Sequence, residues 1–280
     1  MNVPKSKNTM AIPTSRTKEA GVISVDQEKC TGCGQCMAVC PEEAISISGR
    51  FISRDDLFDL SDREKAASYD SLMNLLNHRR SIRNFKNIPV ESGLIQQVLD
   101  AAKSAPMGLP PTDVNVIVFE TREKVRAFTE DFCRYLEKIR WIASGWFLTM
   151  MKPVWGKETD ELFRSFMRPL IDKYINSMKI GEDVVAYDAP VAIYFYGSPW
   201  CDPADPIIAA TYAMFAAESL GLGTCMLGAI HPLIQNGKAA AKFRKDHGIR
   251  LKSREGIFII MGYPKPVFIK WIKRGFASVN

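Results

Sequence analysis

The stretch CTGCGQCMAVCP, residues 30–41, decides the fold of the N-terminal part of the chain because it places four cysteines within eleven positions. Their spacing is Cys30-x2-Cys33-x2-Cys36-x3-Cys40, followed by Pro41. Thiolates at this spacing on a tight loop can all bind one cubane cluster, and Gly32 and Gly34 let backbone N–H groups approach the cluster sulfurs. A structural zinc site usually pairs two distant Cys-x2-Cys knuckles or adds histidine, so the pattern favours iron–sulfur.

The residues around these cysteines form a unit too short to build a hydrophobic core of its own. Domains of roughly 40 residues or fewer usually need a metal or disulfides to fold. A bound cluster would therefore account for the folding of so short a unit. The preceding residues carry scattered lysines and arginines without an apolar run. We therefore predict a flexible arm over residues 1–21, an iron–sulfur domain over 22–60 and a larger domain over 61–280.

Composition and charge exclude several classes of protein. The chain has 280 residues, a formal net charge of +6 and 46% apolar side chains, as expected of a soluble globular protein. The positive charge lies in residues 1–21 and 264–280, so the body between them is nearly neutral and does not resemble a nucleic-acid-binding surface. No apolar run approaches the roughly 18 residues of a membrane span, and the uneven cysteines indicate a reducing compartment, so we expect a cytoplasmic protein.

The larger domain alternates helical and strand patterns, which predicts an α+β or α/β fold. Apolar runs predict strands over residues 114–119, 191–196, 224–227 and 257–261, and helical periodicity predicts helices over 91–104, 206–220 and 236–245. Between the first two strands, residues 121–180 are helical in pattern and rich in aromatic side chains, above all from residue 139 onward. This segment is either ordinary helical core or a lid over a substrate site.

A basic stretch follows the first helical pattern of this domain. Arg79, Arg80, Ser81 and Arg83 offer guanidinium groups and a hydroxyl to a phosphate, although a charged helix end is by itself more often merely solvated. The pattern Arg-Arg-Ser-x-Arg-x-Phe resembles the opening of the nitroreductase-like flavoproteins. SAP at 104–106, AAESLGLGTCMLG at 216–228 and MGYPK at 261–265 agree with that family in the same order. The cysteine run resembles bacterial-type ferredoxins, which hold a 4Fe-4S cluster, and N-terminal ferredoxin fusions occur in this family.

The resemblance implies an α+β, FMN-binding fold with a central mixed sheet flanked by helices. It also implies a homodimer with two flavins at its interface and C-terminal arms that wrap the partner. Carried over by position, the residues that would hold the FMN phosphate and ribityl chain are Arg79, Arg80, Ser81 and Arg83, with Lys273 or Arg274 reaching the phosphate. The residues that would approach the flavin ring are Gly223, Thr224 and Cys225. The basic C-terminus would thus neutralise phosphate rather than meet nucleic acid.

One stretch departs from the family pattern. Where the family usually has Ser or Gly, then Asn, then Gln-Pro-Trp, this chain has MGLPPTD at residues 107–113. Either Met107 and Gly108 supply backbone contacts to FMN, or FMN is bound differently. The departure also argues against transferring a nitroaromatic substrate to this chain.

Several assignments stay open at the level of sequence. In two-cluster ferredoxins the fourth cysteine of such a run ligates the other cluster, and this chain has no second motif. The fourth ligand is therefore Cys40 itself or one of Cys133, Cys201, Cys225 and a cysteine of a partner subunit. Cys225 is either redox-active or, as is commoner for a buried cysteine, a small apolar side chain. We expect His231 to be a helix cap or a surface residue.

We expect an FMN-dependent oxidoreductase in which the iron–sulfur cluster passes electrons to FMN for reduction of a small-molecule acceptor. An electron-donor protein or NAD(P)H would supply the electrons, and no residue need act as a covalent catalyst. Two alternatives remain: an electron-transfer subunit that acts on a protein partner, and specialised flavin chemistry such as reductive dehalogenation. Neither a nucleic acid nor a membrane is an expected partner.

Overall fold

The computed structural model describes residues 34–42, 44–47, 54–108 and 113–279. The expected arm at 1–21, Cys30 and Cys33 lie outside the described residues. The chain divides into two compact units, Met1–Ser68 and Tyr69–Asn280. The first contains the short helix α1 (Gln35–Ala38) and two 3-10 turns, η1 (Arg54–Asp56) and η2 (Arg63–Lys65). Within the described part of the chain, no helix is long and apolar enough to cross a bilayer.

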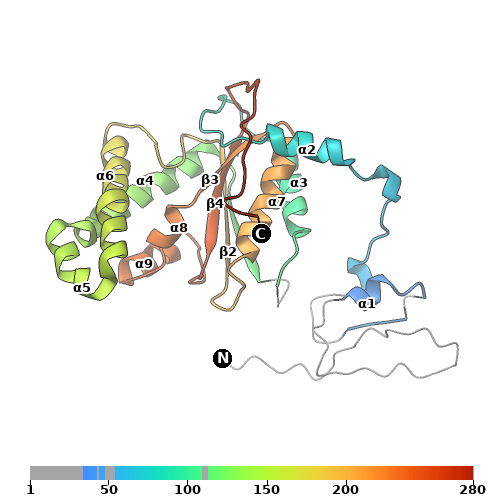
Figure 1. The fold of residues 1–280 in the computed structure, drawn as a ribbon, viewed down its shortest axis with the longest axis horizontal. Coiled ribbons are helices and arrows are strands. Elements are labelled where there is room, and N and C mark those ends of the chain that lie inside the picture. Colours follow the sequence, from blue (N-terminus) through green and yellow to red (C-terminus); the bar gives the residue numbers. More distant parts are fainter. Residues whose placement is uncertain (1–33, 43, 48–53, 109–112, 280) are drawn as a thin grey trace. The chain divides into compact units, whose positions relative to one another are not determined.

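The second unit is built on a four-stranded sheet (Figure 1). The strands are β1 (Val114–Phe119), β2 (Val191–Gly197), β3 (Gly223–Leu227) and β4 (Gly256–Gly262), in the order β1-β2-β4-β3. All three pairings are antiparallel, and a parallel bridge between Ser81 and Thr224 extends the sheet beyond β3. Every residue of β2 and β4 is buried, as expected of central strands that are covered on both faces.

Helices cover both faces of the sheet, because successive side chains of a strand point to opposite sides. On one face, Ile193 and Ile259 pack with α3 (Ser92–Lys103) and α7 (Asp205–Ser219). On the other, Tyr194 and Phe258 pack with α4 (Arg122–Ile139), α6 (Arg168–Lys179) and α9 (Lys238–Asp246). Two further helices of this unit are α2 (Tyr69–His78), which leads into the basic stretch, and α8 (Ile230–Leu233). The α+β prediction is confirmed.

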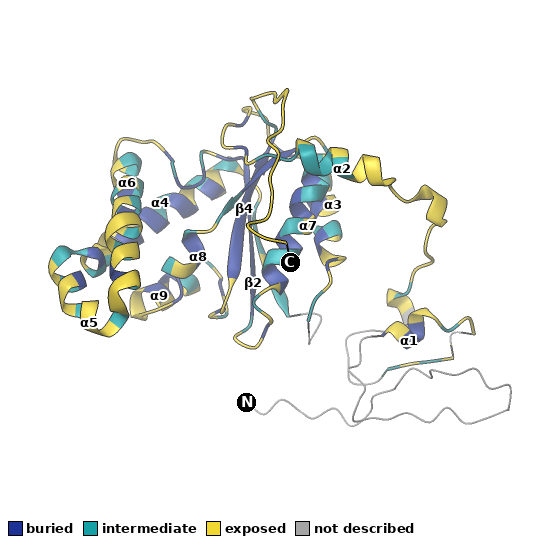
Figure 2. Ribbon diagram, viewed as in Figure 1, coloured by how far each residue is buried: buried dark blue, intermediate teal, exposed yellow. Residues whose placement is uncertain are grey.

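The aromatic segment at 121–180 separates into a core part and an exposed part. The helices α4 and α6 bury Phe132, Leu136 and Ile175 in the core. Between them, η3 (Arg140–Ala143), α5 (Gly145–Leu162) and η4 (Phe163–Met167) form a projecting turn whose outer surface is exposed (Figure 2). Trp146, at 64% exposure, lies on α5. The two interpretations of this segment, helical core and lid, therefore apply to different helices. The helices α4 and α6 belong to the core, and α5 is the candidate lid.

Candidate functional site

The basic stretch after α2 lies against the ends of β3 and β4. The Ile82 N–H donates to the Thr224 carbonyl at 2.9 Å, and Ser81 forms the parallel bridge with the same residue. Further along, the Lys86 N–H donates to the Tyr263 carbonyl at 2.8 Å. These bonds bring the predicted phosphate-binding group, Arg79, Arg80, Ser81 and Arg83, next to the predicted ring-contacting group, Gly223, Thr224 and Cys225.

Gly223 makes this close approach possible. A Cβ atom at Gly223 would lie 2.4 Å from Cγ1 and 2.9 Å from Cβ of Ile82, closer than real side chains approach. Ile82 is buried, in a cluster that also holds Cys225 and Ile260. The glycine is therefore required by the crossing of the two segments rather than by its own backbone conformation.

The side chain of Thr224 is fully buried, and its hydroxyl has no hydrogen-bond partner among the described residues. A buried hydroxyl without a partner costs about 1–3 kcal/mol, so native proteins rarely leave one unless a ligand or water satisfies it. Thr224 pairs with Ser81 through the parallel bridge, so this orphaned hydroxyl belongs to the residue at which the two segments meet. The residues present thus fit a polar cofactor at this position.

Cys225 is the next residue of β3 and is itself buried, in the cluster that holds Ile82 and Ile260. Burial raises the pKa of the Cys225 thiol, and the nearby Arg83 guanidinium, the Ser81 hydroxyl and Arg79 offset part of that rise. The surroundings therefore favour the neutral thiol at physiological pH, as expected of a small apolar side chain rather than a reactive nucleophile.

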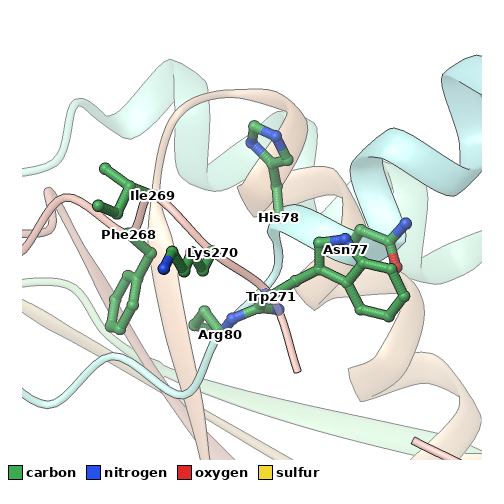
Figure 3. A pocket seen from close by; sticks show the side chains of 7 residues that line it. All are labelled: Asn77, His78, Arg80, Phe268, Ile269, Lys270 and Trp271. Atoms are coloured by element: carbon green, nitrogen blue, oxygen red, sulfur yellow. The ribbon is translucent and has the colours of Figure 1, made fainter. Parts of the chain in front are cut away.

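A cavity of about 100 Å³ lies between the end of α2 and the C-terminal segment (Figure 3). Its lining residues are Asn77, His78, Arg80, Phe268, Ile269, Lys270 and Trp271. Lys270 is the C-terminal cation that lines this cavity with Arg80, whereas Lys273 and Arg274 do not line it. Sequence analysis missed Lys270 because the segment has no regular secondary structure, so no periodicity distinguishes one of its cations from another.

Met107 and Gly108 lie near the N-terminal end of α7, whereas β3 follows the C-terminal end of this helix. The Gly108 N–H donates to both carboxylate oxygens of the buried Asp205, at 2.9 and 3.1 Å, where α7 begins. The 15 residues of α7 span about 22 Å, and β3 follows shortly after its C-terminal end. A single chain therefore does not bring Met107 and Gly108 next to the Ser81–Thr224 bridge.

The first unit contains two of the four proposed cluster cysteines, Cys36 and Cys40, among its described residues. Gly34 adopts a φ of 80° just before α1, which carries the buried Cys36. The Ala44 N–H donates to Cys40 Sγ at 3.4 Å. Backbone N–H groups directed at cysteine sulfur are the contacts that tune iron–sulfur clusters. The residues present therefore fit a cluster.

The three scattered cysteines have different surroundings. Cys133, Cys201 and Cys225 are all buried within the larger unit. Burial raises the pKa of Cys133 and of Cys201 to about 12. Burial also raises the pKa of Cys225, so the surroundings of all three side chains favour the neutral thiol, whereas a cluster ligand must be deprotonated.

His231 lies in the interior, so the expectation of a cap or surface residue is wrong. It is 3% exposed, and its Nδ1 lies 2.8 Å from the Tyr194 hydroxyl. Gly256 leaves room for the ring, since a Cβ there would lie 2.7 Å from His231 Nδ1. The sequence around His231 gave no sign of this, because its partners come from β2 and β4, which are distant in the chain.

Comparison with known proteins places these observations in a family. Residues 76–263 match the model of the Nitroreductase family, and residues 23–46 match that of the 4Fe-4S binding domain. A nitroreductase with bound FMN from Bacteroides fragilis NCTC 9343 has a TM-score of 0.53 and 15% identity, covering 75% of this chain and 97% of its own. A nitroreductase with bound FMN from Desulfitobacterium hafniense DCB-2 has a TM-score of 0.51 and 22% identity, covering 74% and 97%. No curated protein matched the chain.

Proposed function

Since the chain belongs to the Nitroreductase family, we propose that it is an FMN-dependent oxidoreductase fed by its own 4Fe-4S cluster, and that it reduces a small-molecule acceptor. When bound, the cluster would supply single electrons, and FMN would accept them one at a time and deliver two to the acceptor. The observation that carries the proposal is the crossing of residues 79–86 with β3. It brings the Arg79–Arg83 stretch to the start of β3, where Thr224 has a buried hydroxyl without a hydrogen-bond partner among the described residues.

In this proposal different groups of residues bind different parts of FMN. Arg79, Arg80, Ser81 and Arg83 bind the phosphate and ribityl chain through charge-assisted hydrogen bonds. Lys270 adds a cation beside Arg80, with Lys273 and Arg274 as the other candidates. Gly223, Thr224 and Cys225 line the ring. Met107 and Gly108, a helix length away, would contact the ring end or the second flavin of a homodimer.

We propose Cys30, Cys33, Cys36 and Cys40 as the cluster ligands. The Ala44 N–H bond to Cys40 Sγ supports Cys40 as the fourth ligand. The burial of Cys133, Cys201 and Cys225 within the larger unit argues against each of them, because reaching a cluster would require that core to open. The electron donor in this proposal is a redox protein or NAD(P)H.

The test compares wild-type protein, purified anaerobically, with Cys36→Ser and with the matched control Cys133→Ser, which changes a buried cysteine outside the proposed cluster. FMN, iron and acid-labile sulfide are quantified, and flavin reduction by a reduced ferredoxin is followed by absorbance. We expect Cys36→Ser to lose iron and to slow flavin reduction at least tenfold while keeping FMN, and Cys133→Ser to change neither.

The outcomes separate the competing functions. Protein that contains no FMN after reconstitution overturns the proposal. Reoxidation of the reduced flavin by small acceptors supports it, whereas reoxidation by a protein partner alone would assign an electron-transfer subunit. Release of halide from a halogenated acceptor would identify reductive dehalogenation as the reaction. Equal rates in wild type and Cys36→Ser would show that electrons bypass the cluster.

A further inference from the structure

The segment between α6 and β2 contains two neighbouring residues in an unusual backbone conformation. In the described part of the chain, the residues other than glycine with a positive φ are Tyr187, at 55°, and Asp188, at 49°. Aspartate tolerates this left-handed conformation, but a bulky aromatic residue rarely adopts it. Such strain persists only where the surrounding structure fixes it, and it gathers at functional sites. The conformation of Tyr187 is therefore evidence for a role of its side chain.

Side chains from α4 and from the segment itself fix this conformation. The carboxylate of the buried Asp183 accepts the backbone N–H groups two and three residues further on, each at 2.9 Å. Arg126 on α4 donates to the Asp188 carboxylate at 3.0 Å and to the Gly181 carbonyl at 2.9 Å. The segment is thus held on both sides of Tyr187.

The same segment is fastened to the basic stretch that follows α2. Arg122, at the start of α4, donates to the carbonyl of the residue after Tyr187 and, at 3.2 Å, to the Lys86 carbonyl. The Tyr187 side chain packs against the buried cluster that contains Ile82 and Cys225. These contacts bring Tyr187 to the crossing of the basic stretch with β3, on which the proposed FMN site is built.

Arg83 is the residue of the basic stretch that lies over the Tyr187 ring. Its guanidinium carbon is 5.7 Å from the ring centroid, within the range of a cation–π interaction. Arg83 is exposed, and among the described residues no ion pair neutralises it. A cation–π contact uses the charge of the guanidinium and leaves its N–H groups free to donate. The ring therefore holds Arg83 while its donors stay available to an anionic ligand.

Holding this arginine in place has a consequence for binding. An exposed arginine loses rotamer freedom when a ligand immobilises it, and this loss weakens binding, whereas a side chain that is already held loses less. We propose that Tyr187 is a positioning residue of the candidate cofactor site, whose ring holds the Arg83 guanidinium in the orientation that binds FMN. The inference rests on the proposed function, because it takes Arg83 as one of the groups that bind FMN.

The experiment is a double-variant cycle in the full-length protein, from which flavin is removed before FMN affinity is measured by fluorescence titration. Tyr187→Leu removes the aromatic face, and Tyr187→Phe retains it. Each is combined with Arg83→Gln and, as the matched control, with Arg79→Gln, which changes an arginine of the same stretch outside this cation–π pair. Tyr187→Met is made in parallel as a second variant without a ring, and chemical denaturation establishes that each flavin-free protein is folded.

The expected result is a loss of affinity that depends on Arg83. We expect Tyr187→Leu and Tyr187→Met to weaken FMN binding about threefold to fivefold, and Tyr187→Phe to restore the affinity of the wild type. The loss should persist beside Arg79→Gln and vanish beside Arg83→Gln, because the ring acts through Arg83. A merely structural role of the ring would not produce this selective coupling.

Three results would overturn the inference: wild-type affinity in the variants without a ring, equal weakening by Tyr187→Phe, or an undiminished effect of Tyr187→Leu beside Arg83→Gln. In each of them the wild-type protein still binds FMN, so the proposed function stands. Wild-type protein that binds no FMN would overturn the proposed function together with this inference, so the two failures are distinguishable.

Discussion

The Thr224 hydroxyl gives a test of the candidate cofactor site at a single atom. In protein stripped of flavin, Thr224→Val removes a buried hydroxyl that has no partner among the described residues, without changing the shape of the side chain. We expect it to raise the free energy of unfolding by about 1 kcal/mol. If FMN satisfies this hydroxyl, the same change weakens FMN binding about tenfold, equivalent to about 1.4 kcal/mol. Chemical denaturation of the stripped protein and fluorescence titration with FMN measure the two effects.

Thr129→Val is the matched control for this change. Thr129 is also fully buried, but its hydroxyl donates to the Arg126 carbonyl at 3.0 Å and approaches Asp183. Its replacement by valine should therefore destabilise the protein by about 1 kcal/mol and leave FMN affinity unchanged. If both variants lower stability to the same extent, Thr224 is not an unpaired group, and the argument from its hydroxyl fails.

At the scale of elements, the crossing of residues 79–86 with β3 depends on the absence of a side chain at Gly223. Gly223→Ala places a Cβ against Ile82, and we expect a loss of about 2–3 kcal/mol in the free energy of unfolding because the core must shift to admit it. Ile82→Ala removes most of the obstructing atoms. The double variant should therefore be more stable than the sum of the two single effects predicts, by about 1 kcal/mol.

Gly228, in the turn that follows β3, provides the control. A Cβ at Gly228 meets no atom within 4 Å, and its backbone conformation is one that alanine can adopt. Gly228→Ala should leave the denaturation midpoint within the equivalent of about 0.5 kcal/mol of wild type. Equal destabilisation by both alanines would mean that the approach of Ile82 does not explain the effect.

The elements that sequence analysis predicted are those whose patterns are set by burial. The β-branched run at 114–119 and the apolar run at 191–196 are strands because central strands of a covered sheet are apolar on every residue. The aromatic segment could not be divided in the same way. Phe132 on α4 and Trp146 on α5 are both large and apolar, and only the fold determines that the first is buried and the second exposed.

Residues of the candidate site were predictable to the extent that they lie in continuous motifs. The Arg79–Arg83 stretch and Gly223–Cys225 were found by their patterns, and the structure brings them together. Lys270 and the His231 network were missed, because each depends on contacts between segments distant in the chain. Contacts between segments that are distant in the chain leave no local pattern in a single sequence.

At the scale of the whole molecule, the C-terminal segment exposes several large apolar side chains in a single chain. Val267, Ile269, Ile272 and Phe276 are each more than 80% exposed, and described residues 265–279 contain no helix or strand. An exposed apolar stretch of this kind usually marks an interaction site. It supports the proposal of a homodimer in which this segment packs against the second copy.

Ile272→Asp tests that proposal against a matched exposed position. Ile272 is 81% exposed and Ile180, at the end of α6, is 79% exposed, so neither change should alter the stability of a single chain by more than about 0.5 kcal/mol. If Ile272 is buried in a dimer, a charge there costs about 2 kcal/mol or more, and the dissociation constant should rise at least about thirtyfold. Sedimentation velocity across a concentration series measures this change. Ile180→Asp should remain as dimeric as wild type; a wild-type protein that sediments as a monomer, or equal dissociation of both variants, would show that the segment does not hold two copies together.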